Sequence, residues 1–425
     1  AIEELGPIEV LLVAGKGHEK TQDYGNKIIN FSDKKIIKEI IKKRKFNFKK
    51  NYWTNYIFKK AFNKSKLKNV YYNGVSINSK TIKKNNLFFA IHGKNTDGHN
   101  FVKEAIKKGA ARLVISKKIN DLSNNKVIKV QNTFTTLNDL AKATRDCSSA
   151  KILGITGSVG KTTLKNLIGF ALKSYGKVYY SPHSYNNKYG VPLSLSNLKK
   201  NTDYGVFEIG MDKKGEINNL SKIVKPEIAI INNISEAHFK NFKTLKDIAK
   251  AKAEIINNIL KGGSIILNKD DKFFGFLSKI AQKKRIKIIS FGCKNSADIF
   301  LLGIQKIKNY YILKVIVKNK IFYFKTKNST NNFVSNALAC ISALYAFNLD
   351  LKKMKNKFTN FTIPDGRGDI KVVKKFKKKF KFIDESYNAN PLSMKSAIKN
   401  MNYYKRKGNA KKLVLLGDML ELGKK

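Results

Sequence analysis

One short segment constrains the fold of this chain more than any other. Residues 157–163 read GSVGKTT and stand between a β-branched apolar run at 152–156 and a helical pattern over 161–174. Glycines in such a turn let backbone N–H groups face phosphate oxygens, and the N-terminus of the following helix adds positive potential. The strict G-x-x-x-x-G-K-[ST] spacing is not met, because Ile155 stands where the first glycine is usual. The order strand, loop, helix nevertheless predicts an ATP site.

The chemistry of such a loop assigns roles to its residues. Lys161 can reach the β- and γ-phosphates, and the hydroxyl of Thr162 can coordinate Mg²⁺. The residues predicted to bind ATP here are Gly157, Ser158, Val159, Gly160, Lys161, Thr162 and Thr163.

The chain around this loop has the pattern of an α/β protein. Strand-like runs recur at 204–210, 227–233, 264–268 and 285–291, with helical segments between several of them, which predicts a mostly parallel sheet covered by helices. Residues 299–326 alternate apolar and polar, as antiparallel strands do, and a helix of small residues is expected at 333–347. Upstream, short strands alternate with helices over about 70–150 and predict a smaller α/β domain. Downstream, we expect a strand at 380–384, a helix at 391–402 and a strand at 412–417.

Several residues outside the loop are candidates for chemistry, and each also has a structural interpretation. Glu208 ends an apolar strand, where parallel-sheet enzymes place catalytic groups, but a solvated acid at a strand end would look the same. His238 can supply a nitrogen to a metal, although a lone histidine is more often structural. Arg367, between two glycines, could clamp a γ-phosphate. Turn or capping chemistry is the plain interpretation of His99 and of the segment 387–391.

Composition excludes some classes of protein. No apolar run approaches the roughly 20 residues of a spanning helix, so we expect no membrane span. The three cysteines are far apart, which argues against a disulfide framework and favours a reducing, cytoplasmic compartment. The formal charge of 85 − 30 = +55 would suit nucleic acid, yet the lysines are spread along the whole chain. The dense run is 42–68, with eleven Lys+Arg, no acid and interleaved aromatics, and we favour a solvated linker there over a nucleic-acid site.

The motifs, in their order, resemble those of the Mur ligases of peptidoglycan synthesis. The segments that carry the resemblance are NLFFAIHGKNTDGHNFVKEAIKKGA (86–110), ITGSVGKTT (155–163), YNNKYGVPLSL (185–195), FEIGMDKKGEI (207–217), NNISEAHFKNF (232–242), AKAEI (251–255), DESYNANPLSM (384–394) and VLLGDMLELG (414–423). Within the family, YNANP-x-S and LGDMLELG are similar to the MurF subfamily, which joins D-alanyl-D-alanine to UDP-N-acetylmuramoyl-tripeptide. Residues 8–43, with LLVAGKGHEKTQDYG, instead resemble the end of the MurE subfamily, which adds the third amino acid, as in a fusion of the two.

The resemblance implies a three-domain α/β architecture in which a central P-loop domain lies between a small substrate domain and an incomplete Rossmann-like domain. The implied segments are a MurE-like remnant (1–45), a basic linker and the start of the MurF-like part (46–68), a UDP-substrate domain (69–150), an ATP domain (151–362) and a truncated ligase domain (363–425). It also implies a cytoplasmic monomer that binds no nucleic acid.

The same resemblance assigns site residues. It implies that ATP phosphorylates the terminal carboxylate of the tripeptide and that the amine of D-alanyl-D-alanine attacks the resulting acyl phosphate. The catalytic set would be Lys161, Glu208, His238, Lys252 and Arg367, and the Mg²⁺ ligands would be Thr162, Glu208, His238 and Lys252, the last as a carbamylated lysine. Further ATP contacts would come from Asn336, Arg367, Tyr387 and Asn388, and substrate contacts from Ser79, Lys80, Asp97, Gly98, His99, Asn186, Asn187 and Asn390.

Two other functions stay open at this stage. Another amide-forming ligase of the same superfamily, MurE-like or folylpolyglutamate-like, would accept a different amine. A P-loop ATPase dependent on nucleic acid would use the basic run 42–68, and its binding would weaken steeply with salt. Position 78 marks a departure from the family, because the usual D-S-R of the uridine-nucleotide domain is Asn78-Ser79-Lys80 here.

Overall fold

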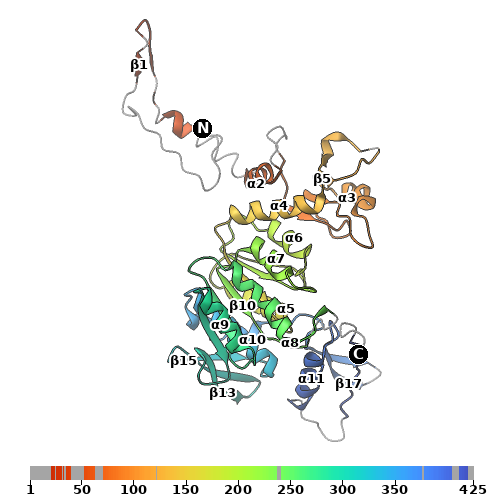
Figure 1. The fold of residues 1–425 in the computed structure, drawn as a ribbon, viewed down its shortest axis with the longest axis vertical. Coiled ribbons are helices and arrows are strands. Elements are labelled where there is room, and N and C mark those ends of the chain that lie inside the picture. The colour runs from red at the N-terminus through yellow and green to blue at the C-terminus, as the bar shows by residue number, and fades with distance from the viewer. Residues whose placement is uncertain are drawn as a thin grey trace. The chain divides into compact units, whose positions relative to one another are not determined.

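A computed structural model describes residues 21–23, 25–30, 32, 35–39, 52–62, 70–120, 122–236, 241–375, 378–403 and 411–419. The chain divides into two compact units (Figure 1). The first comprises Ala1–Ser148 with Leu195–Lys200, and the second comprises Ser149–Ser194 with Asn201–Lys425. The expected strand at 8–14 and the loop at 15–19 lie outside the described residues, as does His238.

The first unit contains the small α/β domain that the sequence predicts, and its sheet is parallel. Its order is β3 (Gly74–Ser76), β4 (Asn86–Phe89), β5 (Arg112–Ile115) and β6 (Val127–Lys129). The short helices η1 (Gly98–Phe101) and α3 (Val102–Lys107) lie between β4 and β5, and α4 (Thr133–Asp146) follows β6. Phe88 and Leu113 form a fully buried core with Ala105 of α3. A separate antiparallel pair joins β1 (Thr21–Asp23) to β2 (Ile28–Asn30).

The basic run contains a helix that the sequence interpretation missed. Helix α2 (Tyr52–Phe62) packs against α4, with Ile57 and Phe58 almost fully buried. The rings of Phe58 and Phe62 stack with their centroids 4.0 Å apart. Residues 52–62 are therefore a packed element and not a linker, and these two aromatic rings serve the core instead of being available to stack on bases.

The second unit contains a mixed sheet, nine-stranded among the described residues, with the predicted parallel part followed by antiparallel strands. The order across the sheet is β15 (Lys320–Thr326), β14 (Tyr310–Val317), β13 (Ile299–Ile307), β12 (Lys287–Gly292), β11 (Ser264–Asn268), β10 (Ile228–Ile231), β7 (Lys151–Thr156), β9 (Tyr204–Glu208) and β8 (Val178–Tyr180). Neighbours from β8 to β13 run parallel, whereas β13, β14 and β15 are antiparallel.

Helices follow most of the parallel strands. They are α5 (Lys161–Leu172), α6 (Gly190–Ser196), α7 (Glu216–Val224), α8 (Leu245–Ala253), which continues into η4 (Glu254–Asn258), α9 (Phe274–Lys283) and α10 (Asn331–Ala346). Helices α5 and α10 pack against each other, and their Leu167 and Leu338 lie in one core with Leu153 and Ile230 of the central strands. This core fixes the start of α5 at the carboxyl end of β7. Among the described residues, no helix is both long and apolar enough to cross a bilayer.

The C-terminal part of the second unit only partly follows the expected pattern. Strands β16 (Asp369–Lys375) and β17 (Lys378–Asp384) pair antiparallel, and α11 (Pro391–Asn400) follows. The strand expected at 412–417 is wrong: residues 411–419 form no regular secondary structure, and Leu413 and Leu415 are more than four-fifths exposed. An apolar run becomes a strand only when a neighbouring strand takes up its backbone hydrogen bonds, and no described strand pairs with this one.

Candidate nucleotide-binding and ligation site

The glycine loop lies at the carboxyl end of β7, beside the end of β10. Its backbone is held by Asn233, whose carbonyl accepts from Ser158 N (2.9 Å) and whose side-chain Oδ1 accepts from Val159 N (2.9 Å). Gly160 adopts φ +80°, and a Cβ there would lie 3.1 Å from Asn232 Nδ2 and 3.3 Å from Asn336 Oδ1. A side chain at position 160 would thus be both strained and crowded, which explains the glycine.

Two lysines converge on one carbonyl of this loop. Lys161 Nζ donates to Gly157 O (2.8 Å) and to Ser158 O (3.2 Å), while Lys252 Nζ, from α8, donates to Gly157 O (2.9 Å). Lys252 is only 1% exposed. Its burial, reinforced by the charge of Lys161, holds the pKa of Lys252 well below its usual value. Lys252 is thus an interior member of the site.

Glu208 lies at the end of β9 and is buried, not solvated. Thr162 donates its hydroxyl to Glu208 Oε2 (2.7 Å), and Asn186 Nδ2 donates to Glu208 Oε1 (2.7 Å). The Thr162 hydroxyl and the carboxylate are hard oxygen donors at the edge of a phosphate-binding loop, and this pair fits Mg²⁺. No group of three or more His, Cys, Asp and Glu gathers among the described residues, and the predicted ligand His238 lies outside them. Mg²⁺ usually binds one or two carboxylates together with water and phosphate oxygens, so this pair suits it.

Lys165 is a member of this site that sequence reasoning missed. Its amine is fully buried, 3.7 Å from Glu208 Oε2, and it donates to the carbonyl of His183. Burial lowers the pKa of Lys165 to about 8, Glu208 raises it and Arg367 lowers it. The spacing in the sequence could have indicated this residue, because a lysine three residues after Thr162 lies on the same face of α5 as Thr162.

Ser184 is the second residue that sequence reasoning missed. Its hydroxyl lies 3.2 Å from Thr162 Oγ1 and accepts from Arg367 Nη2 (3.0 Å) and from Tyr387 Oη (2.8 Å). The guanidinium of Arg367 also stacks on the ring of Tyr387, 4.0 Å from its centroid. Arg367 and Tyr387 are thereby connected to the glycine loop through the hydroxyl of Ser184. No short sequence motif indicated this connection.

The structure brings some predicted residues into this network and leaves others bonded locally. Asn336 Oδ1 accepts from Asn232 Nδ2 (3.3 Å) beside the loop. By contrast, Asn187 caps the start of α6, Asn388 accepts from the next backbone N–H, and Asn390 caps α11. Thr163 is buried in the first turn of α5. The roles of these asparagines in binding remain predictions.

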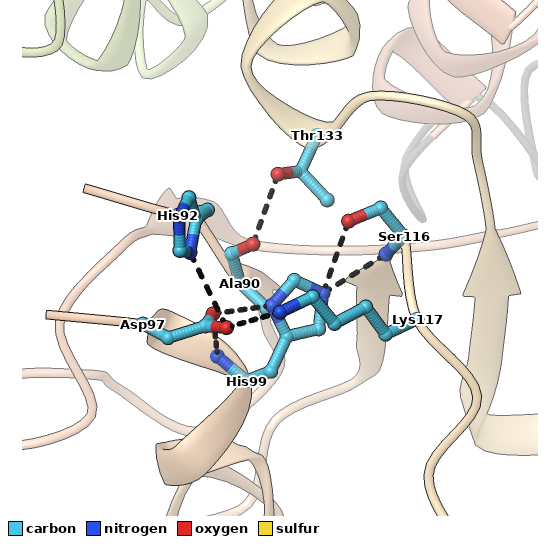
Figure 2. Close-up of polar contacts among 7 residues, drawn as sticks. All are labelled: Ala90, His92, Asp97, His99, Ser116, Lys117 and Thr133. Carbon is cyan, nitrogen blue, oxygen red and sulfur yellow. Dashed lines mark hydrogen bonds and ion pairs between the residues drawn. The ribbon is translucent and has the colours of Figure 1, made fainter. Parts of the chain in front are cut away.

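Two of the substrate residues predicted in the first unit, Asp97 and His99, lie in a compact polar cluster with Ser116 and Lys117 (Figure 2). Asp97 caps η1 and lies 2.6 Å from His99 Nδ1 and 2.8 Å from Lys117 Nζ. His99 Nε2 accepts from the backbone N–H of Ser116 (3.0 Å), so the imidazole proton belongs on Nδ1. Burial alone would raise the pKa of Asp97, but the hydrogen bonds from Lys117 and His99 hold it well below its usual value. Asp97 is therefore the cap of η1, and the His99 ring links this carboxylate to the backbone of Ser116.

The other residues predicted in this unit are also engaged within it. A Cβ on Gly98 would lie 2.7 Å from Ile91 N, so this glycine permits a close backbone approach. Ser79 donates to Glu104 Oε2 (2.7 Å), and Lys80 N donates to Asn78 Oδ1 (2.8 Å). Contact of these residues with a substrate remains a prediction.

Comparison with known proteins agrees with this arrangement. Residues 71–150 match the sequence profile of the Mur ligase family, catalytic domain, and residues 155–344 match that of the Mur ligase middle domain. The UDP-N-acetylmuramoyl-tripeptide–D-alanyl-D-alanine ligase of Rickettsia prowazekii is 34% identical over 83% of this chain and 77% of its own length. The enzyme of the same name from Buchnera aphidicola (Baizongia pistaciae) is 37% identical over 80% and 72%.

Solved structures show the same likeness. A crystal structure of MurF from Acinetobacter baumannii superposes with a TM-score of 0.73 at 26% identity, covering 83% of this chain and 76% of that one. MurF from Thermotoga maritima, in complex with ADP, gives 0.70 at 26% identity over 84% and 80%. The fold and the loop define an ATP-binding α/β protein of the P-loop class. The chain belongs to the Mur ligase family.

Proposed function

We propose that this chain joins D-alanyl-D-alanine to UDP-N-acetylmuramoyl-tripeptide at the expense of ATP, in peptidoglycan precursor synthesis. The observation that carries the proposal is the grouping of the partly buried Lys161 with the buried Thr162 and Glu208 at the glycine loop. It occurs in a chain that is 34% identical, over most of its length, to a ligase of that name.

The reaction follows from what these residues can do. The tripeptide carboxylate attacks the γ-phosphorus of ATP, so that ADP leaves and an acyl phosphate forms. The amine of D-alanyl-D-alanine then attacks the acyl carbon, loses a proton and expels phosphate. Because the reacting groups are anionic, catalysis consists mainly of positioning and charge neutralisation. Lys161 would neutralise the β- and γ-phosphates, and Arg367 the transferred phosphoryl group.

Mg²⁺ would neutralise phosphate charge further when it is held by Thr162 and Glu208. We also propose that Lys252 reacts with CO₂ to form a carbamate. A lowered pKa increases the share of the neutral amine, which is the form that reacts with CO₂. The carbamate formed on Lys252 is an anion, so Lys161 would then lie beside a negative charge and not beside a second cation. Chain equilibrated with ¹³C-bicarbonate should give a carbamate NMR signal that Lys252→Ala lacks, and an unchanged signal in that variant would refute the assignment.

The function is tested by phosphate release from ATP in the presence of UDP-N-acetylmuramoyl-tripeptide. We expect release to require D-alanyl-D-alanine and to fall at least about 100-fold in Lys161→Ala, the usual cost of removing a group that stabilises transition-state charge. The variant should retain its thermal unfolding temperature, which separates lost chemistry from lost folding. Release that is indifferent to D-alanyl-D-alanine but stimulated by DNA or RNA would overturn the proposal.

The same assay addresses the N-terminal segment. We propose, from the residue pattern alone, that residues 1–45 derive from a MurE-type ligase; the matched family profiles begin at residue 71. Release that requires a diamino acid and the UDP-dipeptide, from the complete reading frame, would support a fusion. If no release depends on the diamino acid, while release that depends on D-alanyl-D-alanine is intact, only the MurF-type activity is supported. Because the reaction consumes ATP, we place it in the cytoplasm.

A further inference from the structure

The loop between β8 and α6 connects the glycine loop to the side chains of Arg367 and Tyr387. It contains His183 and Ser184, and it lies between the glycine loop and the segment that contains Arg367 and Tyr387. His183 adopts φ +45°, a left-handed conformation that is costly for a residue with a side chain. The buried amine of Lys165 donates to the carbonyl of this same residue, which holds the bend in place.

The hydrogen-bonding capacity of Ser184 is completely used. Thr162 gives its one hydroxyl proton to Glu208, so the contact between Ser184 and Thr162 requires Ser184 to be the donor. The two lone pairs of Ser184 then accept from Arg367 and Tyr387. A hydroxyl offers one donor and two acceptor sites, and all three are engaged. The result is one directional chain from Arg367 and Tyr387, through Ser184 and Thr162, to Glu208.

We propose that Ser184 is a positioning residue for the ligation reaction: its hydroxyl docks Arg367 and Tyr387 onto the glycine loop, and Lys165 fixes the backbone that presents it. This inference rests on the proposed function for its kinetic consequence but not for its structural one. Without the hydroxyl, the guanidinium of Arg367 would keep its stacking on Tyr387 but lose its link to the nucleotide loop.

The structural consequence is measured first, by hydrogen exchange of residues 366–390 in the full chain without ligands. Ser184→Ala should raise exchange in this segment, and Ser184→Thr, which keeps a hydroxyl, should restore protection. Ser278→Ala is the matched control. It also removes a buried hydroxyl from the second unit, but that hydroxyl has no hydrogen-bond partner in the structure. Unchanged exchange in Ser184→Ala would overturn the proposal, whether or not the chain proves to be a ligase.

The kinetic consequence is measured by phosphate release. Ser184→Ala should lower kcat about 10- to 100-fold, the usual effect of losing a hydrogen bond to a charged group, with Ser184→Thr close to the parent. If Ser184 acts through Arg367, the double variant Ser184→Ala/Arg367→Ala should be no slower than Arg367→Ala alone. Effects that multiply in the double variant would show independent roles and overturn the proposal. A parent chain without D-alanyl-D-alanine-dependent release would refute the function and leave the exchange result to decide the positioning role.

Discussion

Individual side chains in the site differ in how far the sequence could predict them. The glycine loop and Lys161 were predictable because their chemistry is local: residues 157–163 are contiguous, and their backbone provides the binding surface. The burial of Lys252 was not predictable, since it depends on α8 packing beside a loop 95 residues earlier in the chain. Ser184 was missed for the same reason, because its partners lie 22, 183 and 203 residues away.

Glu385 offers a prediction about pH at this scale. The residue is exposed as a whole, but its carboxylate lies beside Gly368, where a Cβ would be 2.9 Å from Oε1. Partial desolvation of the carboxylate raises its pKa to about 7; Arg367 lowers this pKa, and Asp369 and Asp384 raise it. In the unfolded chain a glutamate titrates near about 4.3, so the folded state binds more protons between these values. Its contribution to stability is therefore present at low pH and lost as the pH rises towards 7.

Glu385→Gln removes this titration. The variant should gain in thermal unfolding temperature relative to the parent as the pH rises from about 5 to about 8. Melting curves of the two proteins across that window check the prediction. A difference that stays constant with pH would contradict it.

At the scale of elements, the sequence predicted what periodicity and chain order determine. It placed β7, α5, the antiparallel strands β13–β15 and α10 close to their observed bounds, since strands and helices alternate strongly there. It missed β16 and helix α2, whose lysines obscure the apolar pattern. It also placed a strand at 412–417, because apolar content shows that a run can pair but does not supply its partner.

The packing of α5 on β8 gives a prediction at this scale. A Cβ on Gly169 would lie 2.5 Å from the ring of Tyr180, so α5 approaches β8 only because this position lacks a side chain. Gly169→Ala should destabilise the chain by about 1–3 kcal/mol, the usual cost of overpacking.

A glycine in α9 is the matched control for this substitution. A Cβ on Gly275 meets nothing within 4 Å, so Gly275→Ala should stabilise the chain by up to about 1 kcal/mol through helix propensity. Chemical denaturation of both variants provides the measurement. If both substitutions change the free energy of unfolding in the same direction, close packing does not decide the outcome at residue 169.

For the whole molecule, charge matters more to stability than to the fold. The formal charge of +55 is spread along the chain, and such a charge destabilises a compact state by self-repulsion. The fold nevertheless follows from the apolar pattern, and the aromatic rings of Phe58 and Phe62 in the most basic run are packed.

Salt should therefore stabilise this protein. Raising the ionic strength from about 0.05 M to about 0.5 M shortens the range of charge repulsion, and the thermal unfolding temperature should rise. Scanning calorimetry with chloride salts checks this expectation. A lower unfolding temperature at high salt would indicate that favourable ion pairs outweigh the repulsion.

The buried lysines have a practical consequence for chemical labelling. In a chain with 79 lysines, amine-directed reagents find many targets on the surface. Lys165 and Lys252 are at most 1% exposed, although their lowered pKa values make them more nucleophilic than an ordinary lysine at neutral pH. Packing therefore keeps bulky acylating agents away from both amines. Acylation mapping of the native protein would accordingly read out the intactness of the site, through two amines that become labelled only when the core around them opens.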